Sequence, residues 1–362
     1  MKNTFGQSVS VTLFGESHGE EIGIVIDGLS PGIEIDEEYI AQKLSLRRPK
    51  GRISTARKET DPFRILSGVH NGMTTGTPIC ILIPNGDTKS KDYSALENLA
   101  RPGHADYSAQ CKYHGFQDKR GGGHFSGRIT APIVAAGAIA LKVLENKGIY
   151  IGTHIKECHG IKDRGFENIL SDIKELSNME FPVLCKDSGD KIHEEILLAA
   201  NDGDSVGGIL ETAVWGIPAG VGEPWFDSVE SVLSHILFSV PAIKGVEFGI
   251  GFDFAKKRGS EANDSFKMEN GDVVTVTNNN GGINGGITNG MPIIFSCVVK
   301  PTPSIYKQQK TVDYINKEDA TLNLGGRHDP AIIHRARIVI DSVTALALCD
   351  MLAQRYGTDW LR

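Results

Sequence analysis

Arg120-Gly-Gly-Gly-His-Phe-Ser-Gly-Arg128 leads directly into an apolar run, and helical spacing of the apolar residues predicts a helix from Ala131 to Lys147. Three consecutive glycines let the backbone take positive φ angles and approach a ligand closely. The start of a helix adds unpaired N–H groups and the positive end of its dipole. The stretch therefore predicts an anion site of the kind that binds phosphate. The simpler alternative is a glycine-rich turn with Ser126 as a helix cap.

Upstream of the glycines lies Arg101-Pro-Gly-His-Ala-Asp106. With His124 and Arg128, this segment surrounds the glycine run with arginine and histidine. An isolated Gly-Gly-Gly would favour the simple turn, but this density of cationic and titratable residues favours the anion site.

Composition limits the classes of function. The chain has 362 residues, 40% of them hydrophobic, and a formal net charge of −7. Such a charge does not suit general affinity for nucleic acid or membrane, so any basic site must be local. We expect a single domain over residues 1–362, because no linker composition interrupts the chain.

The cysteines indicate a cytoplasmic protein. Six are scattered without a Cys-x-x-Cys pair, which is typical of free thiols. Neither the cysteines nor the histidines have metal-ligand spacing, so we predict no metal. The longest apolar run, Ala131 to Leu141, is expected to be too short to span a bilayer.

Strands and helices are predicted throughout the chain. Alternation or short apolar runs predict strands at 8–14, 22–26, 65–69, 78–83, 149–154, 207–215, 245–250 and 293–299. Besides the helix after the glycines, helices are expected from Asp36 as cap to Leu46, from Ser188 as cap through Leu197, from Ser228 to Phe238, and from Ile332 to Tyr356. Residues 255–290 are polar and glycine-rich, and are expected to form either a disordered tip or a long loop that orders around a ligand.

Residues 47–64 contain seven basic residues, opposed only by Glu59 and Asp61. A solvated basic face is the ordinary explanation of such a run. In an acidic protein we favour a face for polyanionic ligands, because the arginine fork binds two oxygens of a carboxylate or phosphate.

Three short segments place a histidine beside glycine, arginine or an acid: Gly15-Glu-Ser-His-Gly19, the segment around His104, and Gly325-Gly-Arg-His-Asp-Pro330. Lone histidines in loops are more often structural than catalytic. A Ser-His-Asp triad from Ser17 and Asp329 is conceivable, but no apolar helix follows Gly15–Gly19 as a nucleophile elbow requires.

Taken in order, these and further motifs resemble the chorismate synthase family over essentially the whole chain. The motifs that carry the resemblance are Asn3-Thr-Phe-Gly6, Thr12-Leu-Phe-Gly-Glu-Ser-His-Gly19, Asp27-Gly-Leu-Ser-Pro-Gly32, Arg47-Arg-Pro49, Leu66-Ser-Gly68, Thr74-Thr-Gly-Thr77, Arg101-Pro-Gly-His-Ala-Asp-Tyr107, Arg120-Gly-Gly-Gly123, Gly203-Asp-Ser-Val-Gly207, Gly220-Val-Gly-Glu-Pro224, Lys244-Gly-Val-Glu247, Lys300-Pro-Thr302 and Gly326-Arg-His-Asp-Pro330. Each alone is weak, but their joint order and spacing are specific.

The resemblance implies a reaction and a fold. The family converts 5-enolpyruvylshikimate 3-phosphate to chorismate by anti-1,4-elimination of phosphate, the final step of the shikimate pathway. It requires reduced FMN although there is no net redox change. The implied fold is α+β, a β-α-β sandwich with helices packed between two antiparallel sheets. The implied assembly is a homotetramer, and the absence of a Rossmann fingerprint favours reductant from an external flavin reductase over NADPH used by the chain itself.

The resemblance also implies roles for individual residues. His18 and His104 are expected to be the catalytic histidines beside phosphate and flavin, and Asp329 to manage the proton at flavin N5. Arg47 and Arg52 are expected to clamp substrate or NADP, and Arg128 to hold substrate at the helix start. The implied FMN contacts are His124, Phe125, Ser126, Ala242, Gly285, Lys300, Pro301, Thr302, Pro303, Ser304 and Arg327. His124-Phe125 and Pro241 depart from the usual family residues at their positions.

Two other classes of function compete with the lyase. One is a flavin-independent phosphate-sugar hydrolase or lyase using Ser17 and His18. The other is an RNA-binding protein using residues 47–64, which the negative net charge and the lack of interleaved aromatic residues disfavour.

Overall fold

The computed structural model describes residues 2–51, 53–55, 60–86, 98–325 and 328–362. It is a mixed α+β structure with two five-stranded antiparallel sheets. The first sheet has the order β1 (Thr4–Phe5), β2 (Ser10–Gly15), β3 (Glu21–Asp27), β7 (Ile79–Pro84), β4 (Arg64–Ser67). The second has the order β11 (Ile243–Phe248), β16 (Ile293–Val299), β10 (Gly208–Trp215), β8 (Tyr150–Cys158), β9 (Ile161–Lys162).

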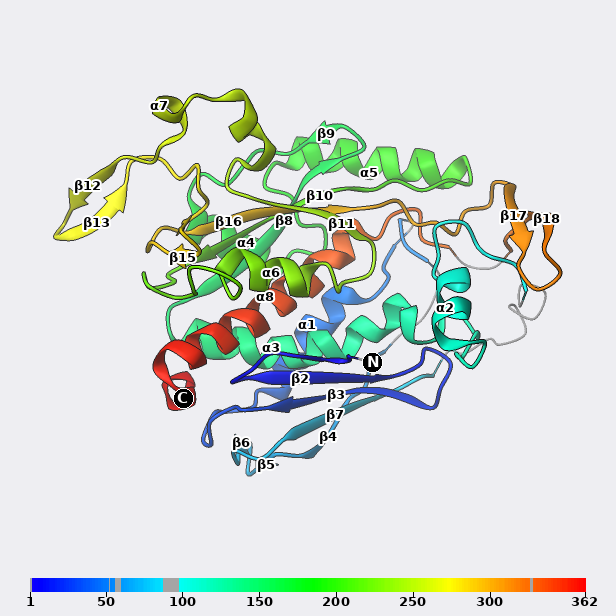
Figure 1. The fold of residues 1–362 in the computed structure, drawn as a ribbon, viewed down its shortest axis with the longest axis horizontal. Coiled ribbons are helices and arrows are strands. Elements are labelled where there is room, and N and C mark those ends of the chain that lie inside the picture. The colour runs from blue at the N-terminus through cyan, green and yellow to red at the C-terminus, as the bar shows by residue number, and fades with distance from the viewer. Residues whose placement is uncertain (1, 52, 56–59, 87–97, 326–327) are drawn as a thin grey trace.

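Three helices, α1 (Glu37–Arg47), α3 (Thr130–Asn146) and α8 (Ile333–Tyr356), lie between the two sheets (Figure 1). Helix α3 contacts β3 and β7 of the first sheet, and α8 contacts β8 and β10 of the second. The two helices pack closely where Gly137 meets Ser342, since a Cβ on Gly137 would lie 2.2 Å from the Ser342 Cβ. The core is therefore a helical layer covered on both sides.

The remaining elements surround this core. They are α2 (Asp106–Tyr113), α4 (Ile169–Leu176), α5 (Lys186–Asn201), α6 (Val229–Leu237) and α7 (Gly259–Ala262), the 3₁₀ turns η2 (Gly123–Phe125), η3 (Gly127–Ile129), η4 (Gly251–Lys256) and η5 (Thr358–Leu361), and the strand pairs β5 (Val69–His70) with β6 (Met73–Thr74), β12 (Phe266–Glu269) with β13 (Asp272–Thr275), β14 (Ile283–Asn284) with β15 (Ile287–Thr288), and β17 (Gln309–Asp313) with β18 (Glu318–Leu322).

Most of the predicted elements are confirmed within a few residues at their ends. Asp36 caps α1 by accepting a hydrogen bond from the Tyr39 amide at 2.9 Å, and Ser228 caps α6 through the Ser231 amide. Ser188 does not cap α5, because that helix already begins at Lys186. The Asp163 carboxylate instead accepts the amides of Leu184 and Cys185 at the entry to the helix.

Two expectations from the sequence were wrong, one about the length of the apolar segment and one about residues 255–290. The apolar segment is longer than expected, because residues 127–146 form a helical stretch long and apolar enough to cross a membrane. However, 78% of its most apolar part is buried inside the protein, which is typical of a core helix. Residues 255–290 are neither a disordered tip nor one long loop. They contain the β12–β13 and β14–β15 pairs, and the Asp264 carboxylate accepts the amides of Asn279 and Asn280 at 2.8 Å each.

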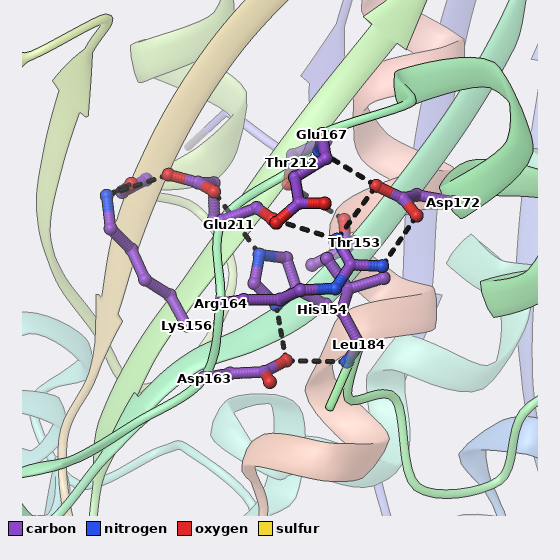
Figure 2. Close-up of polar contacts among 12 residues, drawn as sticks. Thr153, His154, Lys156, Asp163, Arg164, Glu167, Asp172, Leu184, Glu211 and Thr212 are labelled. Carbon is purple, nitrogen blue, oxygen red and sulfur yellow. Dashed lines mark hydrogen bonds and ion pairs between the residues drawn. The ribbon is translucent and has the colours of Figure 1, made fainter. Parts of the chain in front are cut away.

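A network of charged side chains around His154 links β8 and β10 of the second sheet to the segment that contains Asp163 (Figure 2). The side chain of His154 in β8 is fully buried between two carboxylates, with Nδ1 3.1 Å from Asp163 and Nε2 3.2 Å from Glu211. Glu211 also pairs with Lys156 at 2.7 Å, and the nearby Arg164 pairs with Asp172. Burial lowers the pKa of His154, but the hydrogen bonds to Asp163 and Glu211 outweigh it, so the pKa is raised.

We predict that His154→Gln destabilises the protein by about 3 kcal/mol at pH 6, because it leaves two buried carboxylates without their shared cation. A histidine whose folded-state pKa is raised stabilises fully below its unfolded pKa of about 6.5 and loses that contribution as pH rises through the folded value. The difference between wild type and variant should therefore shrink as pH rises above 6.5 in denaturant titrations.

The matched control is His159→Gln, whose side chain is 64% exposed and pairs with Glu195 alone. It should cost less than 1 kcal/mol, as exposed ion pairs do. A penalty for His154→Gln that stays constant from pH 6 to 9 would contradict the charged state of His154.

Candidate active site

The glycine run forms a tight turn that receives the loop after β2. Gly121, Gly122 and Gly123 have φ angles of 68°, 141° and 53°. A Cβ on Gly121 would lie 2.0 Å from the His18 ring, so only glycine admits the histidine at this distance. The Ser17 amide donates to the Gly123 carbonyl at 3.1 Å, and His124 Nδ1 donates to the Gly15 carbonyl at 2.7 Å. The turn and the loop carrying His18 are thus one unit.

Ser126 and Phe125 follow within the same turn. The Ser126 hydroxyl accepts the Arg128 amide at 3.2 Å, which is the capping role considered from the sequence. The Phe125 ring is 43% exposed and lies edge-on to Tyr113 at 6.0 Å between ring centroids. One apolar ring face therefore remains accessible next to the glycines.

Arg128 and Arg47 share a buried carboxylate. Arg128 Nη1 and Arg47 Nη2 both pair with Asp61, the second at 3.5 Å, and the Asp61 side chain is fully buried. Arg128 also donates to Asn85 and to the Pro84 carbonyl at 3.1 Å each. Asp61 takes a left-handed φ of 47°, uncommon for a residue other than glycine. The sequence showed Asp61 only as a charge opposing a basic run, and nothing in the pattern marked its position between two arginines.

His104 lies in a polar cluster at the start of α2. Its Nε2 is 2.8 Å from the Ser304 hydroxyl, and Lys300 Nζ donates to the neighbouring Gly103 carbonyl at 2.5 Å. The Arg101 guanidinium donates two hydrogen bonds to the Asp106 carboxylate, at 2.8 and 2.7 Å. Burial and the Arg101 charge lower the pKa of His104 to about 4, with Asp106 acting in the opposite direction. An ordinary histidine titrates near neutral pH, but His104 is neutral there.

The segment Lys300–Ser304 is fixed to the sheet edge. The Lys300 amide donates to the Ala242 carbonyl at 3.0 Å, and Ala242 has a left-handed φ of 75°. The Ser205 hydroxyl donates to the Thr302 carbonyl at 2.6 Å. Pro301 packs on Gly207, and Pro303 on Gly103. These contacts bring the Ala242 and 300–304 positions beside His104.

Asp329 lies at the entry to α8. Its carboxylate accepts the Thr55 amide at 2.9 Å and pairs with Arg335 at 2.7 Å. The preceding His328 lies against the Tyr306 ring at 4.9 Å between centroids, and its charge acts on His104. Asp329 thus borders the His104 cluster through His328.

Gly285 is separated from the other predicted site residues within the chain. It lies in the turn between β14 and β15, at the opposite end of the molecule from α2 and β17 (Figure 1). Arg52 and Arg327 lie outside the described residues.

A cavity of about 140 Å³ opens between α2 and the glycine turn. Its walls include Arg101, His104, Lys119, Gly121, Gly122, Phe125, Ser126 and Tyr314. Asp106 and Asp118 also line it, paired with Arg101 and Arg120. Lys119 and the backbone donors of the turn suit an anion, and Phe125 and Tyr314 suit a planar aromatic ring system. Within the ranges that the structure describes, no group of three or more His, Cys, Asp or Glu side chains could hold a metal.

Comparison with known proteins adds an independent line of evidence. The family model described as chorismate synthase matches residues 9–353. A chorismate synthase of Thermococcus kodakarensis is 45% identical over 352 residues, which is 97% of each chain, and one of Pyrococcus abyssi is 47% identical over 352 residues with the same coverage. A solved structure titled "Crystal Structure of Chorismate Synthase" superposes with a TM-score of 0.76 at 26% identity, covering 97% of this chain and 94% of that one.

We predict that the His104 ring titrates near pH 4 in NMR experiments that follow its Cε1 proton. The folded pKa lies below the unfolded value of about 6.5, so protonation of His104 costs stability as pH falls from 6.5 towards 4. Arg101→Gln removes a cation that opposes protonation and should raise the midpoint. Arg120→Gln, which removes a mostly exposed arginine paired with Asp118, should not change it. A midpoint above 6 in the wild type would contradict the buried, neutral state.

Proposed function

Because the chain belongs to the chorismate synthase family, we propose that it converts 5-enolpyruvylshikimate 3-phosphate to chorismate at the cavity between α2 and the glycine turn. The family match over residues 9–353 carries the reaction. The location is supported by two residues of the cavity wall, His104, which is hydrogen-bonded to Ser304, and Gly121, which lies against the His18 ring. In the reaction a C–O bond to phosphate breaks, a proton leaves the ring, and a new ring double bond forms.

The charge of the site matches the substrate. The substrate carries two carboxylates and a phosphate, and Arg47 and Arg128 both pair with the Asp61 carboxylate. Their guanidinium groups are of the kind that binds carboxylates and phosphates through two oxygens at once. Lys119 and Arg101 line the cavity, although Arg101 is paired with Asp106. Asp61 keeps the two arginine forks close together before the substrate arrives.

The residues present also fit reduced FMN, the cofactor that the family uses. The backbone of Gly121 and Gly122 lines the cavity wall, and the exposed Phe125 offers an aromatic surface. We propose that the flavin is held by His124, Ser126, Ala242, the 300–304 segment and Arg327. Gly285 is proposed for the same role, which its distant turn can fulfil only from another copy of the chain in the proposed homotetramer. When bound, reduced FMN would supply electron density to the substrate as the C–O bond to phosphate breaks, and would regain it from the substrate as the ring proton is lost, so no net redox change would result.

The chain's own groups manage protons and the leaving phosphate. His18 is proposed to donate a proton or hydrogen bond to the phosphate, since it lies against Gly121 in the anion-binding turn. His104, neutral at pH 7, is proposed to act as a hydrogen-bond donor that Ser304 orients. Asp329, held by Thr55 and Arg335, is proposed to accept the proton that flavin N5 would take from the substrate.

We expect chorismate to form when substrate and chemically reduced FMN are mixed anaerobically with the enzyme. NADPH with oxidised FMN should give product only after an external flavin reductase is added. Equal rates with NADPH alone would overturn the external source of reductant, while phosphate release without any flavin would favour the hydrolase alternative.

His18→Ala, His104→Ala and Asp329→Asn should each slow phosphate release by about 10²–10⁴-fold, the usual contribution of general acid–base groups. Single-turnover phosphate release with reduced FMN measures this, and flavin titration checks that the variants fold and bind cofactor. Near-wild-type release from Asp329→Asn would exclude it as the proton acceptor.

We also propose that the chain assembles as a cytoplasmic homotetramer. The β12–β13 pair projects from the body of the molecule (Figure 1) and carries Phe266, Met268 and Val273, all at least 60% exposed. Such an exposed apolar arm is typical of a surface that another copy covers.

Phe266→Ser with Met268→Ser should weaken the tetramer because it removes the apolar surface of that arm, and sedimentation velocity would show smaller species at micromolar concentration. Leu198→Ser on α5, which is 56% exposed, is the matched control and should leave the assembly unchanged. An unaltered tetramer in the double variant would remove the arm from the interface.

A further inference from the structure

A second cavity lies inside the helical layer, separate from the proposed active site. Its volume is about 160 Å³, several times the ~30 Å³ that one water occupies in the liquid. It is bounded by α1, α3, α4, α8 and the start of β8, and its charged lining residues are Lys43, Glu145, Lys174, Arg337 and Asp341. No role in the proposed reaction accounts for these charges.

Lys43 is the least satisfied of these groups. The residue is 6% exposed, and burial lowers the pKa of its ammonium. Among the described residues, which include every residue lining this cavity, its hydrogen bonds amount to one of 3.5 Å to the Ser177 carbonyl, and no carboxylate lies within 4 Å of Nζ. The Tyr39 ring face, 4.8 Å away, supplies weak additional stabilisation. A buried ammonium has three N–H donors, and these two contacts leave part of its hydrogen-bonding capacity unsatisfied.

The acids of the cavity already have partners. Asp341 accepts the Thr153 hydroxyl at 2.6 Å and lies 3.4 Å from Arg337, and Glu145 accepts the Tyr39 hydroxyl at 2.6 Å. Arg337, 1% exposed, donates otherwise to the Met179 carbonyl. Of the three cations that line the cavity, Lys174 is exposed to solvent and Arg337 pairs with Asp341, so Lys43 is the buried cation without a carboxylate within 4 Å. The unfilled bonding capacity therefore belongs to the cations.

We propose that this cavity binds a small carboxylate monoanion between Lys43 and Arg337. A single negative charge would give the Lys43 ammonium its missing partner, whereas a phosphate dianion would bring a second negative charge close to Glu145 and Asp341. The planar guanidinium of Arg337 and the Lys43 ammonium can each donate to carboxylate oxygens. The site lies one turn along α1 from Arg47, so it is next to the substrate-binding arginines without being part of them.

Acetate is the probe, compared with chloride at equal ionic strength. A ligand that binds only the folded protein raises the free energy of unfolding by RT ln(1 + [L]/Kd), so we expect acetate at about tenfold excess over Kd to raise the thermal midpoint by about 1–3 °C. Lys43→Met keeps the length of the side chain and should abolish this acetate-specific rise.

Lys142→Met is the matched control. Lys142 contacts the same Tyr39 ring at 5.2 Å but does not line the cavity, so this variant should keep the full acetate effect. No acetate-specific rise in the wild type, or an equal rise in Lys43→Met, overturns the proposal. Chorismate formation is measured separately, so failure of the proposed active site would leave this result unaffected.

A second measurement does not depend on a variant that folds. Wild-type crystals soaked in trifluoroacetate should show its density between Lys43 Nζ and the Arg337 guanidinium. Density that fits water alone at that position, with the soaked anion bound only near Arg47 and Arg128, would overturn the proposal.

Discussion

The structure depends on burying the side chains of α3, which are apolar around the whole helix. Thirteen of its residues are buried, including small ones such as Ala135 and Gly137 around the whole circumference. A helix that is apolar all round needs neighbours in every direction. Helices α1 and α8 provide them within the layer, and β3 and β7 close the layer on one side. The second sheet covers α8 on the other side. Burying this one apolar helix therefore goes with a helical layer that has a sheet on each side.

Burying α3 also fixes where its N-terminus lies. The glycine turn that precedes it must emerge at the edge of the layer, where the loops after β2 and β16 also end. The turn accommodates the His18 ring because Gly121 has no side chain, and it presents N–H groups and the guanidinium of Arg128 at the same edge. The strongest packing element and the proposed chemistry are therefore parts of one continuous segment.

The sequence predicted the local features well and the long-range pairing poorly. Periodicity located α1, α3 and α8 and most strands, and the glycine run marked the turn that lines the cavity, because these signals act over a few residues. Asp61 pairs with Arg47 and Arg128 across 14 and 67 residues, and no periodic signal reports such a contact. The fall in the His104 pKa comes first from burial, which only the folded chain supplies, and then from the charge of Arg101, three residues away in the sequence. The family resemblance supplied residue roles that composition and spacing could not.

The buried face of helix α1 contains two basic residues at positions where apolar side chains are expected. Ile40, Lys43, Leu44 and Arg47 lie on one face at helical spacing, and all four are buried. Two of these positions hold basic residues where the period calls for apolar ones, and lysine and arginine are rarely buried without partners. Arg47 has the Asp61 carboxylate, whereas Lys43 has only a long bond to a carbonyl beside a cavity. Replacing Lys43 by an apolar residue would remove a desolvation cost, so its presence is better explained by a bound anion than by folding alone.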